Sequence, residues 1–379
     1  MRCDWSIGAR ADAASDSRAL EPGPLLLTIF PTFAIGGAQV RYAAFANRFG
    51  PAYRHAIIAM DGTLACRERL APGLDVQFPA FAARKGATLS TVRAARQVLR
   101  ALRPQVLVTN NWGAIEWAMA NALPLARHIH IEDGFGPEER ATQIPRRVWT
   151  RRLFLRRSTV VLPSRTLWRI ATETWKLDPA RLRYIPNGID LARFATEARP
   201  AAGAVPVIGT VAALRAEKNI GRLLRAFRIV TAETRARLVI VGDGPERAGL
   251  AALCERLGLG DHVTFAGHLA DPAPCYREFD IFALSSDTEQ MPLSVLEAMA
   301  SGLAVAATDV GDVREMLAAG NQPFIAPCDD AALAERLLAL IRAPDRAAIG
   351  AENRAKARRD YDQERMFRAY AALMDGADE

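Results

Sequence analysis

Short apolar runs alternate with longer segments of helical period along most of the chain. Four runs in the first half have the composition of buried strands: 24–30, 106–111, 128–133 and 159–164. A Gly-containing turn and a helical segment at 39–49 follow the first of them. After a Pro-, Ala- and Gly-rich stretch at 199–205 the alternation begins again. This pattern is typical of α/β proteins built on parallel sheets.

The second half repeats this alternation, and its strand and helix segments are more clearly separated. Strands are predicted at 206–212, 237–245, 263–269, 280–286 and 302–309, and helices at 219–230, 246–259, 293–300 and 362–374. We therefore expect a flexible leader at 1–22, one doubly wound, Rossmann-like domain at 23–198, a second at 206–360, and a C-terminal helix within 361–379. Two such domains facing one another would place a ligand between the carboxyl ends of both sets of strands.

Composition narrows the choice of partners without settling it. The 379 residues suit two domains, and a net charge of +7 favours anionic partners such as nucleotides, phospholipid head groups or nucleic acid. Five scattered cysteines, never spaced as CxxC, argue against a disulfide framework or a structural zinc site and fit a reducing compartment. Without a long apolar run or a secretory signal, a cytoplasmic location is expected.

Two segments after predicted strands carry groups suited to phosphate. Gly36 and Gly37 allow close approach of the backbone, and the helix behind them offers free amides to an anion. The alternative is a tight turn without a ligand. Arg215 and Lys218 follow the strand at 206–212 and would suit a diphosphate at the mouth of a parallel sheet. The alternative for these two residues is a pair of solvated surface cations.

The segment TEQMPLSVLEAMASG at 288–302 holds two carboxylates in an otherwise apolar stretch. Pro292 suits the first turn of a helix whose free amides at 293–295 would bind an anion. Glu297, one turn further, could accept hydrogen bonds from vicinal hydroxyls such as those of a ribose, and Glu289 would lie on the other side of the phosphate. The alternative is an exposed loop acid and the polar face of an amphipathic helix.

Together, EQMPLSVLEAMASGLAVAATDVGDVREML, LRAEKN, VGDGP and IPNGID resemble the C-terminal donor domain of retaining GT-B glycosyltransferases of family 4. Glu289 and Glu297 match the E-x7-E signature of that family. The resemblance covers roughly 24–375 and is strongest over 185–315. It implies the GT-B fold, with two Rossmann-like domains, an interdomain cleft, and a terminal helix that packs back on the N-terminal domain. Gln290 replaces a frequent Gly, and Ala216 a frequent Pro.

The resemblance also implies transfer of a sugar from a nucleotide-diphosphate sugar to an acceptor hydroxyl in polysaccharide or glycolipid biosynthesis, with no metal and no cofactor. Arg215 and Lys218 would bind the diphosphate, Glu297 the ribose and Glu289 the transferred sugar. The full donor-binding set would be Gly36, Gly37, Arg215, Lys218, Glu289, Pro292, Leu293, Ser294 and Glu297. The catalytic set would be Glu289, His130, Arg215 and Lys218.

In the N-terminal half, His130 of HIHIEDG is the candidate for the histidine that many relatives place beside the donor sugar. His128 lies on the same strand face and is an alternative, and a structural histidine is another. Glu132 and Asp133 are candidates for binding the acceptor, which would be a glycan or a lipid-linked molecule.

The run RRVWTRRLFLRR at 146–157 could rest on an anionic membrane, making the protein peripheral at the inner face. Otherwise it is a solvated helix with a buried apolar stripe. No nucleic-acid-binding signature accompanies it. Two other functions stay open, a non-catalytic sugar-nucleotide-binding protein and a related GT-B epimerase, whereas a glycan phosphorylase would need a much longer chain.

Overall fold

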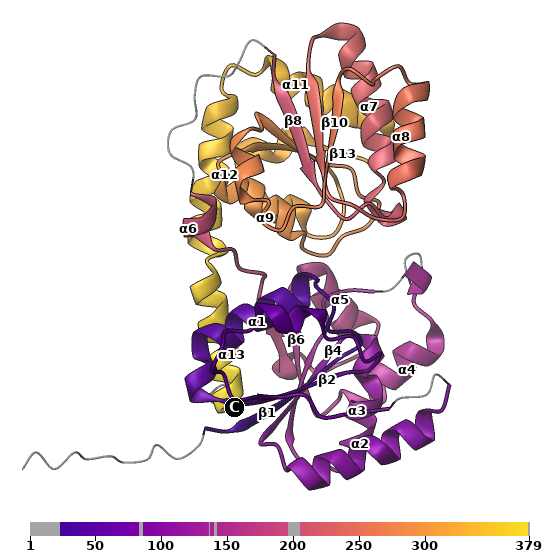
Figure 1. Ribbon diagram of the computed structural model, residues 1–379, viewed down its shortest axis with the longest axis vertical. Coiled ribbons are helices and arrows are strands. Elements are labelled where there is room, and N and C mark those ends of the chain that lie inside the picture. The colour runs from indigo at the N-terminus through magenta and orange to yellow at the C-terminus, as the bar shows by residue number, and fades with distance from the viewer. Residues whose placement is uncertain (1–22, 83–85, 136, 140–141, 196–204, 378–379) are drawn as a thin grey trace, which may run out of the picture.

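The computed structural model describes residues 23–82, 86–135, 137–139, 142–195 and 205–377 and places them in two stacked lobes (Figure 1). Each lobe contains one sheet, and every strand pair in both sheets is parallel. The predicted α/β class with two doubly wound sheets is confirmed. The predicted leader at 1–22 and the linker residues 199–204 lie outside the described residues.

The lower lobe in Figure 1 is built on a seven-stranded sheet of order β3-β2-β1-β4-β5-β6-β7. Its strands are β1 Leu25–Phe30, β2 Arg54–Ala59, β3 Val76–Gln77, β4 Val106–Asn110, β5 Arg127–Ile131, β6 Thr159–Leu162 and β7 Leu182–Tyr184. Its helices are α1 Gly37–Phe49, α2 Thr88–Leu102, α3 Ile115–Ala120, α4 Pro145–Phe154 and α5 Arg165–Glu173. The short helix α6, Leu191–Phe194, already packs on the upper lobe, where Phe194 joins the core around Tyr276. The strand order reverses between β1 and β4, which makes this the point where such sheets bind ligands.

The upper lobe is built on a six-stranded sheet of order β10-β9-β8-β11-β12-β13. Its strands are β8 Val207–Val211, β9 Arg237–Val241, β10 Val263–Gly267, β11 Ile281–Leu284, β12 Ala304–Thr308 and β13 Ile325–Ala326. Its helices are α7 Ile220–Glu233, α8 Arg247–Arg256, α9 Leu293–Ala300, α10 Val313–Met316, α11 Asp330–Arg342 and α12 Arg346–Asp360. The order reverses between β8 and β11.

The segment 237–245, predicted as a strand that ends in a glycine turn, has this form. Strand β9 stops at Val241, and the backbone turns at Gly242 with φ +133°. A Cβ at Gly242 would lie 1.9 Å from the carbonyl oxygen of Ala212. The turn after β9 therefore packs directly against the loop after β8, and only glycine permits that approach.

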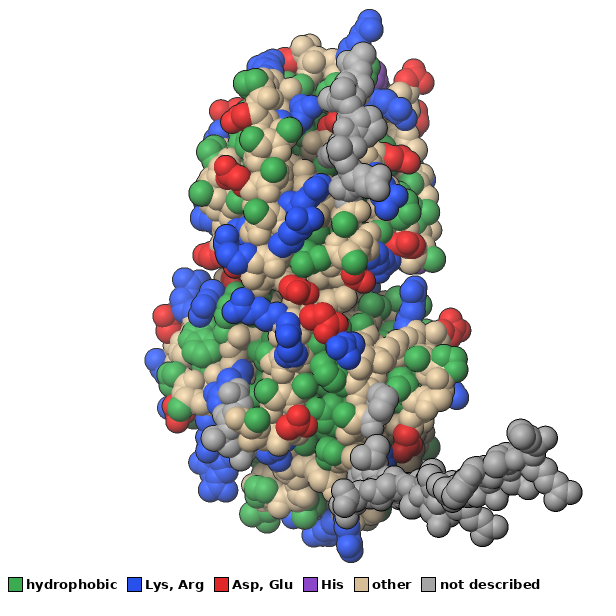
Figure 2. Space-filling model, turned by 90° about the vertical axis from the view of Figure 1, so that its left-hand side faces the viewer, with side chains coloured by type: hydrophobic (Ala, Val, Ile, Leu, Met, Phe, Trp, Pro, Cys, Tyr) green, Lys and Arg blue, Asp and Glu red, His purple; other side chains and the backbone are tan. Residues whose placement is uncertain are grey.

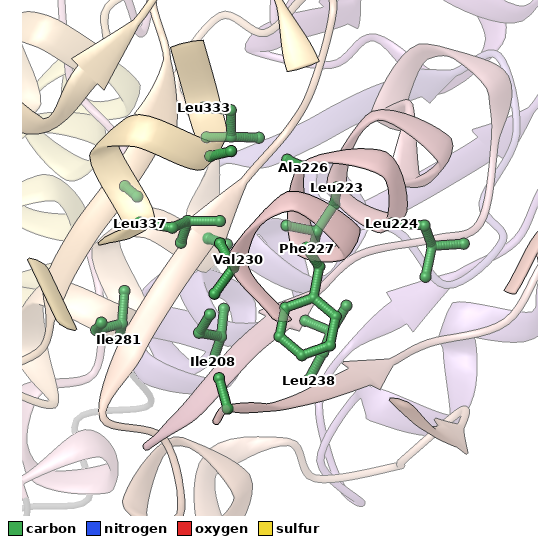
Figure 3. Close-up of a cluster of buried hydrophobic side chains, with 14 of the residues drawn as sticks. Ile208, Leu223, Leu224, Ala226, Phe227, Val230, Leu238, Ile281, Leu333 and Leu337 are labelled. Atoms are coloured by element: carbon green, nitrogen blue, oxygen red, sulfur yellow. The ribbon is translucent and has the colours of Figure 1, made fainter. Parts of the chain in front are cut away.

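Buried aliphatic side chains fill the space between the second sheet and its outer helices. Figure 3 shows Leu223, Phe227 and Val230 of α7 beside Ile208 of β8, with Leu337 of α11 next to them. Near-continuous apolar strands such as β11 and β12 are buried on both faces, as parallel strands covered by helices must be.

The last two helices connect the lobes. Helix α12 packs on the upper lobe, where Asn353 donates to the carbonyl of Leu303 at 2.9 Å. Helix α13 (Gln363–Asp375) then joins the core of the lower lobe, with Phe367 and Tyr370 clustered against residues such as Phe45. The two helices run along one side of both lobes in Figure 1. The final segment is thus part of the first sheet's core although it follows the second sheet in sequence.

The carboxyl ends of both sheets point at the boundary between the lobes. Helices α1 and α5 of the lower lobe lie beneath α9 of the upper lobe (Figure 1). In the space-filling view the molecule narrows at this boundary, and acidic and basic side chains gather along it (Figure 2). Charged groups on the loops after the strands are therefore brought together where the lobes meet.

Candidate active site

The loops after β8 and β11, which flank the reversal point of the second sheet, place a cation beside a carboxylate. Lys218 ends a short 3₁₀ turn, Ala216–Lys218, and its Nζ lies 2.6 Å from Oε1 of Glu289. Ser286 donates its hydroxyl to the same oxygen at 2.7 Å. The side chains of Lys218 and Glu289 remain 25% and 10% exposed. The pair is thus largely buried but still accessible to solvent, as a pair that binds a ligand must be.

Backbone contacts fix these two loops against each other. The hydroxyl of Ser285 donates to the carbonyl of Lys218 at 3.0 Å, and the amide of Asp287 donates to the carbonyl of Glu217 at 2.9 Å. Arg222, at the start of α7, pairs with Asp287 at 2.7 Å and donates to the carbonyl of Ser285. The position of Lys218 relative to Glu289 therefore follows from the loops rather than from the ion pair alone.

A third loop, after β12, packs against the backbone of Glu289. A Cβ at Gly311, where φ is +55°, would lie 2.3 Å from the carbonyl oxygen of Glu289. The amide of Asp312 donates to the carbonyl of Gln290 at 2.9 Å. Position 311 therefore requires glycine for two reasons: its φ is positive, and the backbone of Glu289 leaves no room for a side chain.

The start of α9 provides free amides beside this pair. Pro292 is the N-cap and offers no side-chain cap, and the amides of Leu293 and Ser294 have no hydrogen-bond partner among the described residues. The prediction of three free amides was wrong for Val295, whose amide donates to the carbonyl of Pro292 at 3.2 Å in a tightened first turn. Two donors remain where a phosphate would be stabilised by the helix terminus.

Glu297 lies half-buried one turn further along α9. Tyr276 donates its hydroxyl to Oε2 of Glu297 at 2.5 Å. Burial raises the pKa of Glu297, and the hydrogen bond from Tyr276 opposes that rise. Burial and Glu297 together raise the pKa of Tyr276. No spacing in the sequence links Tyr276 to Glu297, so sequence reasoning missed this partner.

The remaining predicted donor-binding residues are divided between the two lobes. Arg215 is exposed, and within the described part of the chain it forms no ion pair, which leaves its guanidinium available. Gly36 is the N-cap of α1, and a Cβ at Gly37 would lie 3.3 Å from Cδ1 of Leu293. The beginnings of α1 and α9 therefore face each other across the lobe boundary.

His130 lies in the interior of the lower lobe instead of at its surface. Its side chain is fully buried, and its Nδ1 lies 2.8 Å from the hydroxyl of Thr109, which also bonds Nε2 of His128 at 2.9 Å. Both histidines share one strand face, as their spacing predicts. Among the described residues, His130 forms no hydrogen bond or ion pair with Lys218 or Glu289; its partners are Thr109 and Glu132, whose Oε2 lies 3.5 Å from its Nε2.

The two acidic candidates that follow β5 have different surroundings. Glu132 is fully buried and pairs with Arg151 at 3.1 Å. Asp133 accepts both arms of the Arg41 guanidinium, at 2.7 and 2.9 Å. Arg41 also donates to Asn187, whose amide group donates to the carbonyl of Met291 in the upper lobe. Sequence reasoning missed Arg41, because its partner is 92 positions away.

Helix α4 turns one of its four arginines entirely inward. Arg151 pairs with Glu132 and Glu139, and its guanidinium lies 4.9 Å from the ring centroid of Trp175 and 5.0 Å from that of Trp112. The inner side of this segment thus combines an apolar stripe, Val148, Phe154 and Leu155, with an ion-pair cluster around Arg151 that the sequence did not predict. The outer side keeps Trp149 66% exposed and Leu153 51% exposed.

Metal-ligand clusters and membrane-spanning helices are both absent from the described residues. These residues contain no group of three or more His, Cys, Asp or Glu side chains placed to hold a metal ion. They also contain no helix that is long and apolar enough to span a membrane.

Comparison with known proteins places both lobes in one family. The model of Glycosyltransferase Family 4 matches residues 35–193, and that of Glycosyl transferases group 1 matches residues 205–343. Anabaena HepE, solved in complex with UDP and glucose, superposes with a TM-score of 0.76 at 18% identity over 93% of this chain and 100% of HepE. WaaG, a glycosyltransferase involved in lipopolysaccharide biosynthesis, superposes with a TM-score of 0.69 at 17% identity over 92% of this chain and 99% of WaaG. The fold is therefore that of the GT-B glycosyltransferases.

Sequence relatives agree with the family models. The putative colanic acid biosynthesis glycosyltransferase WcaL of Salmonella typhimurium is 28% identical over 231 residues, which are 58% of this chain and 57% of WcaL. The GDP-mannose-dependent alpha-mannosyltransferase of Mycobacterium tuberculosis is 32% identical over 148 residues, 37% of each chain. The matches thus span 57% of WcaL and 37% of the mannosyltransferase. The chain belongs to the group 1, family 4 glycosyltransferases.

Proposed function

We propose that this protein is a retaining glycosyltransferase that moves a sugar from a nucleotide-diphosphate sugar to an acceptor hydroxyl. The observation that carries the proposal is the Lys218–Glu289 pair, 2.6 Å apart, at the reversal point of the second sheet and beside the free amides of α9. A cation, two helix amides and carboxylates are the groups that a diphosphate and a sugar require.

Each group has a role in this proposal. Arg215 and Lys218 bind the diphosphate and stabilise the charge that develops as the nucleotide leaves. The amides of Leu293 and Ser294 bind a phosphate oxygen, and Glu297, positioned by Tyr276, accepts hydrogen bonds from the ribose. Glu289 contacts the hydroxyls of the transferred sugar. The leaving phosphate takes the acceptor proton, so the sugar is attacked on the face that the nucleotide leaves and its configuration is retained.

The donor and the acceptor are proposed by class. The complexes of HepE with UDP-glucose and with UDP support a nucleotide-sugar donor. The relatives in colanic acid and lipopolysaccharide core biosynthesis support an acceptor from polysaccharide or glycolipid assembly. We propose transfer without a metal ion, because Arg215 and Lys218 supply the positive charge at the diphosphate. Arg146, with the exposed Trp149, keeps the outer side of α4 suited to an anionic membrane surface.

A donor screen tests the proposal. UDP-glucose, UDP-N-acetylglucosamine and GDP-mannose are added in turn, and thermal unfolding is followed, since a ligand that binds only the folded state raises Tm. We expect at least one donor to raise Tm in the wild type and in Lys356→Ala, which removes a half-buried lysine of α12 paired with Asp360, but much less in Lys218→Ala. Transfer is then assayed with membrane extract as acceptor, with and without EDTA, and the anomeric configuration of the product is read by NMR.

The outcomes separate the alternatives. Turnover with retained configuration in EDTA supports the proposal. Donor binding without turnover would point to a sugar-nucleotide-binding module, and interconversion of the donor sugar without an acceptor would point to an epimerase. If Lys218→Ala left the donor-induced rise in Tm unchanged, the diphosphate would not bind at this loop.

A further inference from the structure

A basic pocket lies at the opposite edge of the first sheet from the candidate active site. It has a volume of about 250 Å³ and opens beside the beginnings of β5 and β6, at Arg127 and Thr159. The candidate active site lies at the lobe boundary, which the carboxyl ends of these strands face, so the pocket is at the far edge of the first sheet from it. The pocket is smaller than the roughly 300–1,000 Å³ of drug-sized sites. It suits a small head group.

Positive charge dominates this pocket. Arg127, Arg156, Arg157 and Arg181 line it, and none of the described residues that line it is acidic. Among the described residues, Arg156, Arg157 and Arg181 form no ion pair. Arg181 reaches the pocket from a separate 3₁₀ turn and donates to the carbonyl of Arg157 at 3.4 Å. Arg127 adds charge while donating to the carbonyls at the end of α13. Three guanidinium groups are thus left to bind an anion.

The rim of the pocket is apolar. Leu153 and Phe154 line it from the end of α4, and Leu153 is 51% exposed. Pro124 lines the other side, between Leu123, 71% exposed, and Leu125, 38% exposed. Planar guanidinium groups bind phosphate oxygens in a bidentate manner, and exposed aliphatic side chains beside them suit acyl chains. The ligand chemistry is therefore an anion with an apolar extension.

We propose that this pocket binds a phosphoryl group, such as the head group of an anionic lipid. Arg156 and Arg157 hold the phosphate oxygens from one side and Arg181 from the other, while Leu153 and Leu123 contact the chains. This site differs from general adsorption of α4 to a membrane. It depends on Arg181, which lies outside α4, and not on Arg152, which lies on α4 but does not line the pocket.

The floor of the pocket supplies a reporter. His128 lines it, and its Nδ1 lies 2.7 Å from the hydroxyl of Ser158, another lining residue. His262 and His268, in the upper lobe, are exposed and far from the pocket in sequence. An anion bound in the pocket should shift the ring resonances of His128 while leaving those of His262 and His268 in place.

The test uses the full chain without a sugar donor, so it does not depend on transfer activity. Glycerol 3-phosphate is titrated by isothermal calorimetry and by NMR of the histidine rings, and sedimentation is measured with phosphatidylcholine vesicles with and without phosphatidylglycerol. The variants are R156Q/R157Q, Arg181→Gln, and Arg152→Gln as the matched control. Circular dichroism and Tm establish that each variant is folded, as expected for exposed side chains without ion-pair partners.

We expect binding to phosphatidylglycerol vesicles to weaken on the order of fivefold for each pocket arginine removed, with little change for Arg152→Gln. Binding of vesicles but not of glycerol 3-phosphate identifies a lipid as the source of the phosphate. Binding of both, with His128 shifted, identifies the phosphate ester itself. If neither probe binds, or if Arg152→Gln weakens vesicle binding as much as Arg181→Gln does, the pocket is not a phosphoryl site.

Discussion

Nζ of Lys218 and Oε1 of Glu289 lie 2.6 Å apart, although 71 positions separate the two residues. They belong to the loops after β8 and β11, which are adjacent strands at the reversal point of the second sheet. Removing either charge should lower transfer by about 10²–10³-fold, the range found when one preorganised electrostatic group is removed. We expect Lys218→Ala to lower donor affinity as well, and Glu289→Gln to act mainly on turnover.

Glu217→Ala is the matched control for this pair. Glu217 is next to Lys218, but only its backbone carbonyl is used, as acceptor for the amide of Asp287. Its replacement should leave both kcat and donor affinity near wild type. Full transfer activity in Lys218→Ala would contradict the proposed site.

Glu297→Gln should separate stability from function. Because burial raises the pKa of Glu297, the folded protein holds this proton more tightly than the unfolded chain does. The stability from this group is present below the unfolded pKa, about 4.3, and is lost as pH rises through the folded pKa. Gln carries no charge to bury, so the variant should have a higher Tm than wild type at neutral pH and a weaker affinity for the donor.

The comparison for this prediction is Glu315→Gln, which changes an exposed acid on α10. We expect neither Tm nor donor affinity to change there. The gap in Tm between Glu297→Gln and wild type should shrink as the buffer is acidified. A donor affinity equal to that of wild type would remove Glu297 from the ribose site.

Asp312→Ala should loosen the contact between the lobes. The buried carboxylate of Asp312, in the upper lobe, accepts the amides of Arg165 and Thr166 at the start of α5 in the lower lobe. Each hydrogen bond to a charged group contributes about 1.5–3 kcal/mol to stability. The free energy of unfolding, measured in urea, should therefore fall by an amount of that order. Asp309→Ala, which removes an exposed ion pair with Arg314, should cost less than about 1 kcal/mol. Equal losses would contradict this role for Asp312.

Arg151→Met should be among the most destabilising single changes in the lower lobe. It leaves the carboxylate of Glu132 buried without its cation, which typically costs about 3–5 kcal/mol. Arg152→Met, on the exposed side of the same helix, should change the free energy of unfolding by no more than about 0.5 kcal/mol. Chemical denaturation of both variants measures these changes in the free energy of unfolding. A small effect for Arg151→Met would mean that the aromatic cluster around it can repack without the charge.

Acid should destabilise the lower lobe through His128. Burial, assisted by His130, lowers the pKa of His128 to about 3, so the unfolded chain binds this proton first. The stability from the neutral ring is complete above about pH 6.5 and falls as pH decreases from there toward 3, by up to about 1.4 kcal/mol per pH unit. His128→Gln should therefore give a shallower loss of Tm between pH 6.5 and 5. Exposed His262→Gln should leave the slope unchanged.

The local pattern of apolar and polar residues was sufficient to predict most strands and helices of the second lobe. The apolar run at 280–286 predicted β11 (Ile281–Leu284), and helical spacing predicted α9 (Leu293–Ala300). The short strands β3, β7 and β13 were not predicted, because two or three residues carry no period. Their pairing depends on neighbouring strands that are distant in sequence.

The sequence by itself determined the fold class and brought Lys218, Glu289 and Glu297 forward as one site. Strand and helix periods, glycine turns and helix starts are local properties, and the linked motifs stand in a fixed order. Only the tertiary structure decided which charged groups are buried and with whom. It enclosed His130 and Glu132 in the lower lobe, gave Glu297 its partner Tyr276, and turned Arg151 inward. Those outcomes depend on contacts between segments tens to hundreds of positions apart, and the desolvation of a charge is set by all of them together.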